Sequence, residues 1–253
     1  MELWTPEHIR TLLPSVAVMI LLTFLLRYLL RNKSHNVRMI PMKIIACILV
    51  VLEIGKQGLS LYRGYDLYNL PFHFCSLFIF AMPALAFYKG KHRQQVYGVV
   101  IALSAAMTIL TLIYPNLIYG PWSVVGYFKD YMSFHTVTFH NLMILAFFLM
   151  IGLEIHTPAP KQEAGSVLVF TFGFCIVAAV MSQLLKTNYA GFYSCNVPIF
   201  EAVRLGLQPV IGVAFAQVVY VLVVAALHVS FTYGSYWAYV GLRRLASREK
   251  EKV

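Results

Sequence analysis

The sequence predicts an all-α, polytopic membrane protein in which seven transmembrane helices form one bundle. Hydrophobic residues make up 60% of the 253-residue chain, and only 12% of the residues are charged. The mean hydropathy of +0.72 lies outside the range of soluble domains and inside that of multi-pass membrane proteins. We therefore expect a single helical domain over residues 1–253, located in the cell membrane.

Seven apolar segments are long enough to cross a membrane. A bilayer core about 30 Å thick requires about 20 mostly apolar residues in a helix. Because the links between the segments are short, successive helices are expected to be antiparallel neighbours. The expected spans cover residues 11–31, 40–62, 70–88, 96–115, 132–153, 166–187 and 209–232.

The distribution of lysine and arginine predicts the orientation. The first link, the third link and the C-terminal tail (residues 241–253) are rich in basic residues, whereas the second, fourth and sixth links contain one each. The positive-inside rule therefore places the N-terminus outside the cell and the C-terminus and tail in the cytoplasm. The first apolar run lacks a small-residue cleavage site, so we expect a span and not a signal peptide.

The formal charge of +10 does not indicate a nucleic-acid partner, because the basic residues form no stripe along one domain. In short links and in the tail they are expected to contact anionic lipid head groups. The four cysteines show neither CxxC nor zinc-type spacing, and the chain contains no phosphate-cradling glycine loop or dinucleotide fingerprint. We therefore expect no cofactor and no metal. The oligomeric state is not indicated.

Polar residues within the predicted spans gather toward the outer end of the bundle, and the inner halves of the helices contain few. Glu53, Lys56, Gln57 and Ser60 share one face of the second span, because they are spaced i, i+3, i+4 and i+7. An isolated charge in hydrocarbon is costly, so Glu53 and Lys56 are expected to pair or to line a wet cavity. The sequence thus predicts a pocket open to the extracytoplasmic leaflet. Its other expected polar residues are His73, Cys75, Ser76, His135, His140 and Asn188.

These groups also have structural interpretations. Glu53 and Lys56 fit an ion pair that fixes helix packing as well as they fit a functional site. His135 lies near the membrane interface, where ordinary solvation explains it. His73 and His140 are harder to explain in this way, because an ionisable ring within a span is costly, and for them a functional role is favoured.

One stretch, Tyr68 to Leu77, concentrates the candidate chemistry. A histidine, a thiol and a hydroxyl stand at His73, Cys75 and Ser76, just after Pro71. A buried thiol is usually inert, so an inert Cys75 is favoured over a nucleophilic one.

The pattern Asp66-x-x-Asn69-Leu70-Pro71-x-His73-x-Cys75-Ser76-Leu77, preceded by an intramembrane Glu and Lys, resembles bacterial YwaF-type integral membrane proteins. Phe139-His140-Asn141 and Thr187-Asn188-Tyr189 fall where that family's fifth-helix histidine and its Asn-Tyr element are expected. The resemblance covers residues 40–200.

The YwaF-type family is in turn similar to the eukaryotic transmembrane protein 164, a phospholipid acyltransferase, and more distantly to the androgen-induced membrane hydrolases of fatty-acid esters. The resemblance implies that His73 and His140 act in acyl chemistry. In the acyltransferase an Asn-Pro-Cys-His motif places a proposed cysteine nucleophile directly before the histidine, but Phe72 stands there in this chain. The nearest thiol, Cys75, follows His73 by two residues, which on a helix point about 200° apart. The cysteine nucleophile therefore does not carry over. The threonine nucleophile of the hydrolases matches no particular residue.

We predict acyl transfer or ester hydrolysis on a membrane lipid, with His73 and His140 as general base and orienting group, because imidazole titrates near neutral pH. The nucleophile is Cys75, Ser76 or an acceptor hydroxyl that a histidine activates directly. Glu53 and Lys56 would polarise one of these histidines or hold a head group, and Asn188 or a tyrosine would stabilise an oxyanion. The expected substrate-binding residues are Glu53, Lys56, Gln57, His135, Asn188 and Tyr189.

The alternative is a small-solute transporter or a ligand-sensing membrane protein that uses the same Glu, Lys and His residues as a relay or pocket. The scarcity of polar groups in the inner halves of the helices argues against a complete path. A lipid-binding scaffold for envelope assembly is a third possibility. A separation of His73 and His140 beyond about 10 Å, with no connecting cavity, would exclude a shared role in proton transfer.

Overall fold

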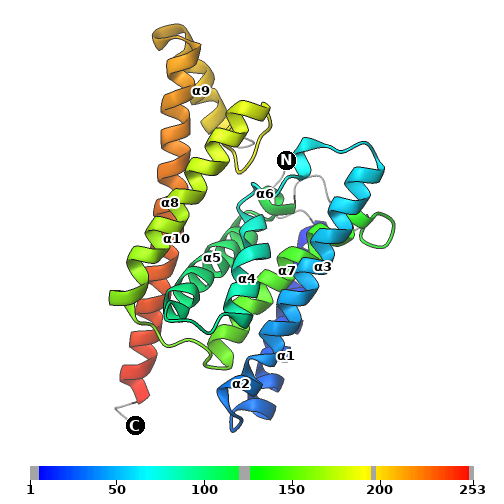
Figure 1. Cartoon of the computed structure of the whole chain (residues 1–253), viewed down its shortest axis with the longest axis vertical. Helices are drawn as coiled ribbons and strands as arrows, with labels where there is room; N and C mark the ends of the chain where they lie inside the picture. Colours follow the sequence, from blue (N-terminus) through cyan, green and yellow to red (C-terminus); the bar gives the residue numbers. More distant parts are fainter. Residues whose placement is uncertain (1–5, 120–125, 195–197, 251–253) are drawn as a thin grey trace.

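The computed structural model describes residues 6–119, 126–194 and 198–250, and within these ranges the chain forms helices and no strand. Long helices run along the long axis of the molecule, and shorter helices and two 3-10 turns lie between them (Figure 1). The long helices are α1 (Pro6–Leu30), α3 (Ile40–Tyr62), α5 (Arg93–Ile113), α7 (Tyr131–Gly152), α8 (Pro160–Leu185) and α10 (Val213–Lys250). The short ones are α2 (His35–Arg38), η1 (Leu67–Asn69), η2 (Cys75–Leu77), α4 (Phe78–Phe87), α6 (Pro115–Tyr119) and α9 (Pro198–Ile211).

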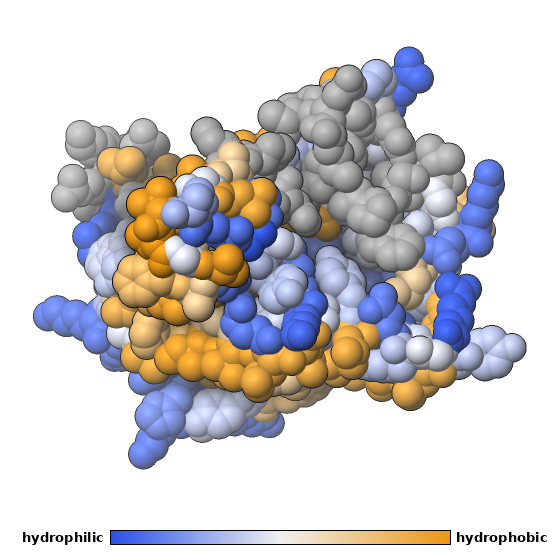
Figure 2. All heavy atoms as spheres, turned by 90° about the horizontal axis from the view of Figure 1, so that it is seen from above, coloured by the Kyte–Doolittle hydropathy of each residue, from blue (hydrophilic) through white to orange (hydrophobic). Residues whose placement is uncertain are grey.

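In the part of the chain that the structure describes, five helices are long and apolar enough to cross a membrane. Seen from one end, hydrophobic residues follow the flank of the bundle and hydrophilic residues lie toward the middle (Figure 2). The all-α, membrane-spanning fold is thus confirmed, with candidate spans at five of the seven expected places. These five are Ile9–Leu30, Arg93–Ile113, Tyr131–Gly152, Pro160–Leu185 and Val213–Ser247.

The other two expected spans differ from each other. The expected helix over 40–62 is α3, with the predicted bounds. The helix expected over 70–88 is only partly present: α4 begins at Phe78 and has ten residues, or about 15 Å of helix. Pro71 explains the late start, because a proline disfavours helical geometry in the residue before it, and Leu70 is extended with ψ 145°. His73 therefore lies in an irregular segment, which we call the 63–77 link.

Helix α5 lies at the centre of the bundle. It packs against α4 and α7 on one side and against α8 and α10 on the other (Figure 1). Its buried hydroxyls, Ser104, Thr108 and Thr111, each donate to the carbonyl four residues earlier, at 2.7 Å. These hydroxyls are therefore satisfied within their own helix.

The links gather at two ends of the bundle. At one end the guanidinium groups of Arg27 and Arg38 donate to the carbonyls of Gly152 and Leu153, at 2.7 and 2.8 Å, which joins the first link to the end of α7. The last turns of α1 and α10 also lie at this end (Figure 1). We call it the basic end, because the three regions rich in lysine and arginine meet there. The segment 241–250 is not a separate tail but the end of α10.

At the opposite end the 63–77 link meets two other links. The Tyr189 hydroxyl donates to the carbonyl of Leu67 at 2.5 Å, which ties the segment after α8 to this link. Arg63 and Asp130 lie 3.9 Å apart and connect it to the start of α7. The opposite end, seen face-on in Figure 2, thus contains the expected site residues.

Candidate functional site

A buried ion pair on α3 forms the centre of the site. The ammonium of Lys56 lies 2.8 Å from Glu53 Oε1, and the amide of Gln57 donates to the same oxygen at 2.7 Å. The spacing i, i+3, i+4 brings the three side chains to one face of the helix. Glu53 and Lys56 are only 7% and 8% exposed, so the pairing that the sequence predicted is present and buried.

His135 of α7 meets this ion pair. Its Nε2 lies 3.4 Å from Glu53 Oε2, and its ring stacks on Phe139 at a centroid distance of 5.2 Å. His135 is 7% exposed, so the interpretation of a solvated interfacial histidine is wrong. Nε2 has no hydrogen-bond partner in the described part of the chain, so the contact with Glu53 is an ion-pair distance without an aligned hydrogen bond.

Gln57 and Ser60 hold the 63–77 link against α3. The Gln57 amide also donates to the carbonyl of Asn69 at 2.7 Å, and its oxygen accepts from the Tyr65 hydroxyl at 2.7 Å. The amide of Asn69 donates to Ser60 Oγ at 2.9 Å. Gln57, expected as a substrate-binding residue, therefore uses its side chain to fix the backbone that leads to His73.

His73 lies between two tyrosines. Its Nε2 donates to the carbonyl of Tyr68 at 2.9 Å, so the neutral ring keeps an unprotonated Nδ1. The ring centroids of Tyr68 and Tyr189 lie 4.5 and 5.4 Å away. His73 also interacts electrostatically with Lys56 and Glu53.

His140 of α7 has the complementary arrangement. Its Nδ1 donates to the carbonyl of Thr136 at 2.7 Å, which leaves Nε2 as the unprotonated nitrogen of the neutral ring. Its ring packs edge-on against Tyr119 at 5.9 Å. His140 interacts electrostatically with His73, His135 and Lys56.

Cys75 and Ser76 follow His73 in the short turn η2. Ser76 is 3% exposed, and its backbone N–H donates to the carbonyl of His73 at 3.0 Å. Cys75 is half-buried and interacts electrostatically with Lys56 and Glu53. Both residues therefore lie on the turn that follows the histidine, and Cys75 interacts with the charged cluster.

The two residues of the Asn-Tyr element, Asn188 and Tyr189, make different kinds of contact. The side-chain oxygen of Asn188 accepts from the backbone N–H groups of Tyr193 and Ser194, both at 3.3 Å, so it braces its own loop. These contacts use only the amide oxygen of Asn188, and its amide nitrogen is the atom that the expected role of oxyanion donor would need. Tyr189 is fully buried, and its ring stands edge-on to His73 and to Phe72, at 5.4 and 5.3 Å. Burial raises the pKa of the Tyr189 hydroxyl.

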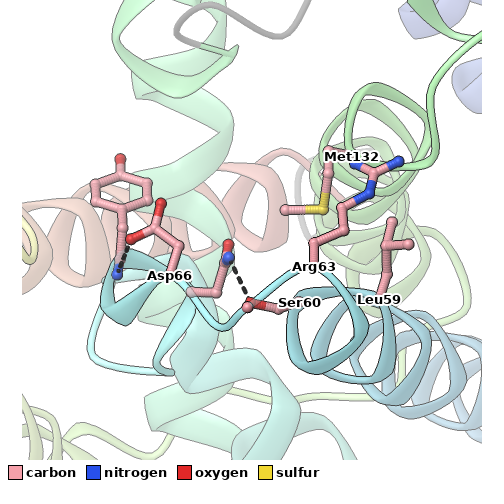
Figure 3. A pocket seen from close by; sticks show the side chains of 8 residues that line it. Leu59, Ser60, Arg63, Asp66 and Met132 are labelled. Carbon is pink, nitrogen blue, oxygen red and sulfur yellow. Dashed lines mark hydrogen bonds between the residues drawn. The ribbon is translucent and has the colours of Figure 1, made fainter.

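A pocket opens at the opposite end, above this cluster. Its volume is about 250 Å³. Figure 3 shows Arg63 and Met132 on one side and Asp66 on the other, with the hydrogen bond to Ser60 between them. Ser60 lies one turn beyond Lys56 on the same face of α3, so the pocket and the buried ion pair share one wall. The residues that line the pocket are Leu59, Ser60, Arg63, Gly64, Asp66, Tyr68, Asn69 and Met132.

A second buried polar cluster lies at the basic end, and the sequence analysis missed it. Glu163, which is 0% exposed, accepts on Oε1 from Gln94, His156 and the backbone N–H of Ala159, at 2.5, 2.9 and 2.8 Å. Its Oε2 accepts from the Tyr236 hydroxyl at 2.7 Å. The members of this cluster lie in the links and helix ends outside the predicted spans, so the prediction from polar groups within the spans did not include them.

No signal in the sequence joins the members of this second cluster. Glu163 stands in the first turn of α8, next to a link, and Tyr236 lies 73 positions further along the chain. Neither cluster provides a metal site, because among the described residues no group of three or more His, Cys, Asp or Glu side chains is arranged to hold a metal ion.

The fold and this site define a multi-pass α-helical membrane protein with a buried charged cluster beneath a pocket at one end. The chain belongs to the TMEM164 family, whose model matches residues 3–234. The match includes every expected site residue and Glu163, and it ends just before Tyr236. Comparisons with curated proteins and with solved structures found no match.

Proposed function

We propose that this protein transfers or hydrolyses an acyl ester of a membrane lipid in the site around His73 and His140. One observation carries the proposal. Two histidines are each oriented by a carbonyl and each keep one unprotonated nitrogen, and both interact electrostatically with the buried ammonium of Lys56. Acyl transfer needs a base for the attacking hydroxyl and a positive group for the oxyanion that develops on the carbonyl oxygen.

The reaction follows from these roles. A histidine, through His73 Nδ1 or His140 Nε2, takes the proton from the hydroxyl of an acceptor lipid or of water. The oxygen attacks the ester carbonyl, and the ammonium of Lys56 stabilises the negative oxygen of the tetrahedral intermediate. Collapse of the intermediate breaks the ester C–O bond, and the leaving alkoxide takes the proton from the imidazolium. If an acyl-enzyme forms instead, Cys75 and Ser76 are the candidate nucleophiles, since both stand beside His73.

The pocket above the cluster gives the lipid a place to bind. Arg63 and Asp66, on its two sides, can contact the charges of a polar head group, while the acyl chains stay in the bilayer beside the exposed apolar flanks. We place the protein in the cell membrane with the basic end in the cytoplasm and the N-terminus outside, according to the positive-inside rule. In this orientation α3 and the short α4 complete a seven-span bundle, and the site faces the extracytoplasmic leaflet.

An apolar layer favours this function over transport of a small solute. Leu49, Met82, Leu103 and Met143, from α3, α4, α5 and α7, belong to one apolar core and are each 0% exposed. A relay or a solute path would require polar groups or water at this depth. The second buried cluster is therefore no continuation of the first.

The proposal is tested with purified protein in lipid nanodiscs that contain isotope-labelled phospholipid. Lipid mass spectrometry measures lysolipid, free fatty acid and transacylated products. We expect products with the wild type and a fall of about 100-fold or more with His73→Ala or His140→Ala, the usual range for loss of a general base. The matched control is His228→Phe, because the ring of His228 packs among aromatic side chains of Phe74 and Phe192 and takes no part in the cluster.

Two outcomes would contradict the proposal. One is a wild type that forms no product but binds a small solute, which favours a transporter or sensor. The other is equal activity in His73→Ala and His228→Phe. Intact-protein mass spectrometry separates the two chemical routes, because an acyl adduct that disappears in Cys75→Ala would show an acyl-enzyme.

A further inference from the structure

At the basic end Arg93 contacts His35, and Arg38 lies three residues after His35 on the same short helix. His35 and Arg38 belong to the short helix α2, and Arg93 is the first residue of α5. Arg93 Nη2 lies 2.6 Å from His35 Nε2, and the Arg93 guanidinium lies 5.0 Å from the centroid of the Tyr97 ring. Arg38 interacts electrostatically with His35 as well. The three side chains come from two elements that are distant in sequence but adjacent in the fold.

His35 takes part as a neutral acceptor. A guanidinium only donates, so the nitrogen that faces Arg93 must be unprotonated. Burial, and then the charges of Arg93 and Arg38, lower the pKa of His35. The group therefore holds two cations, with an imidazole that orients one of them.

The two guanidinium groups have more donors than partners. Arg38 donates through Nη1 to the carbonyls of Leu153 and Glu154, at 2.8 and 3.4 Å. The Nε atoms of Arg38 and Arg93 are buried without a hydrogen-bond partner in the described part of the chain. None of the ion pairs between described side chains includes either arginine. Buried donors of this kind call for an acceptor that the chain does not supply.

We propose that Arg38 and Arg93, with Arg93 oriented by His35, form a binding site for a phosphoryl group at the basic end. A guanidinium presents a planar fork of donors that matches the oxygens of a phosphate, and such charge-assisted hydrogen bonds are among the strong ones. The phosphoryl group belongs either to an anionic lipid head group at the membrane surface or to a free phosphate. This site is independent of the acyl chemistry at the opposite end.

The test measures binding by native mass spectrometry of the detergent-purified full chain, titrated with phosphatidylglycerol in one arm and with inorganic phosphate in the other. The variant R38Q/R93Q removes both guanidinium groups. The matched control K33Q/K91Q removes two exposed charges from the same two links. We expect R38Q/R93Q to weaken binding about tenfold or more, the effect of losing charge-assisted hydrogen bonds, and K33Q/K91Q to change it by less than about twofold.

The two arms identify the source of the phosphoryl group. Specific binding in the phosphatidylglycerol arm only assigns a lipid head group, and binding in the phosphate arm assigns a free phosphoryl ligand. Absence of binding in both arms overturns the proposal, and so does an equal loss in R38Q/R93Q and K33Q/K91Q, which would indicate diffuse charge attraction. Because Arg38 also contacts α7, the variant R93K provides a second measurement if R38Q/R93Q does not fold. It keeps the charge but loses the fork, so wild-type binding by R93K would also overturn the proposal.

Discussion

Glu53 and Glu163 are both buried carboxylates that face the core, yet their surroundings differ. Glu163 receives four hydrogen bonds from fixed donors, and its partner His156 is itself held, with Nδ1 3.1 Å from the Tyr239 hydroxyl. Glu53 is bonded on one oxygen to Lys56 and Gln57, and its other oxygen only approaches His135, at 3.4 Å.

The difference separates a structural cluster from a candidate site. A fully satisfied buried network rigidifies a fold, and any group added to it would have to displace an existing partner. The cluster around Glu53 keeps unprotonated imidazole nitrogens and lies beneath a pocket of about 250 Å³. Spare hydrogen-bonding capacity, rather than burial or charge alone, therefore distinguishes the candidate site at the opposite end from the cluster around Glu163.

The largest effect is expected from breaking the satisfied cluster. Glu163→Ala leaves His156, Gln94 and Tyr236 without their shared acceptor in a dry interior. We expect the free energy of unfolding to fall by about 3–5 kcal/mol, the range for breaking a buried polar pair. Thermal unfolding of the detergent-purified protein measures this. Glu163→Gln, which keeps one acceptor oxygen, serves as the milder control. A midpoint unchanged in Glu163→Ala would show that the cluster does not hold α5, α8 and α10 together.

Removal of one partner from the cluster around Glu53 should lower activity more than stability. Lys56→Met removes the ammonium, but Glu53 keeps its hydrogen bond from the Gln57 amide. We expect a smaller stability loss, of about 1–3 kcal/mol, because only part of the pairing is lost. Activity should fall about 100-fold or more if the ammonium stabilises an oxyanion. Unfolding and lipid-product assays on the same preparation measure the two effects. A variant that unfolds as easily as Glu163→Ala but keeps its activity would reverse the assignment of the two clusters.

Two glycine-to-alanine substitutions compare how tightly the two clusters are packed. A Cβ at Gly98 would lie 2.6 Å from Glu163 Cβ, the stem of the side chain, which cannot move aside. A Cβ at Gly55 would overlap the hydroxyl of Tyr131, the far end of a flexible side chain. We expect Gly98→Ala to cost about 1–3 kcal/mol, as overpacking does. Gly55→Ala should cost less, mainly through the hydrogen bond from Tyr131 to the Leu52 carbonyl.

Thermal unfolding of both glycine variants is compared with Gly173→Ala, where a Cβ meets nothing within 4 Å. A helical glycine in open space gains stability when replaced by alanine. If Gly55→Ala lowered the unfolding midpoint more than Gly98→Ala, the packing around the Glu53 cluster would be tighter than the packing around the Glu163 cluster.

The sequence determines more of the fold than of the site. The expected span over 40–62 coincides with α3, because a mostly apolar run in a membrane has no alternative to a helix. The same expectation fails over 70–77, where the backbone is irregular but buried in protein. There backbone groups bond locally, as from the Ser76 N–H to the His73 carbonyl, and Gln57 of α3 binds the Asn69 carbonyl just before the segment. Composition does not reveal such partners.

The site was predicted to the extent that it depends on local spacing. Helical periodicity alone places Glu53 and Lys56 on one face. The pairing of Glu53 with His135, a residue 82 positions away, depends on how α3 packs against α7, which periodicity does not encode. The four hydrogen bonds to Glu163 likewise depend on the packing of four separate elements of the chain. The sequence therefore indicates the candidate residues, but only the folded structure shows which of their hydrogen-bonding groups already have partners.

The smallest expected effect concerns His35, the one histidine held beside two arginines. Its pKa in the folded protein is lowered from 6.5, so the unfolded chain binds a proton first as the pH falls. Stability should therefore decline as the pH falls through about 6.5 toward the folded pKa, and remain lower below it. Because solvent screens the partly exposed ring, we expect a difference of only a few tenths of a kcal/mol. The unfolding midpoint at pH 7.5 minus that at pH 5.5 is compared between the wild type and His35→Gln. Groups that titrate at both buried clusters contribute equally to the two proteins, so they cancel in this comparison. A pH dependence that is identical in both proteins would show that His35 is not held neutral between Arg38 and Arg93.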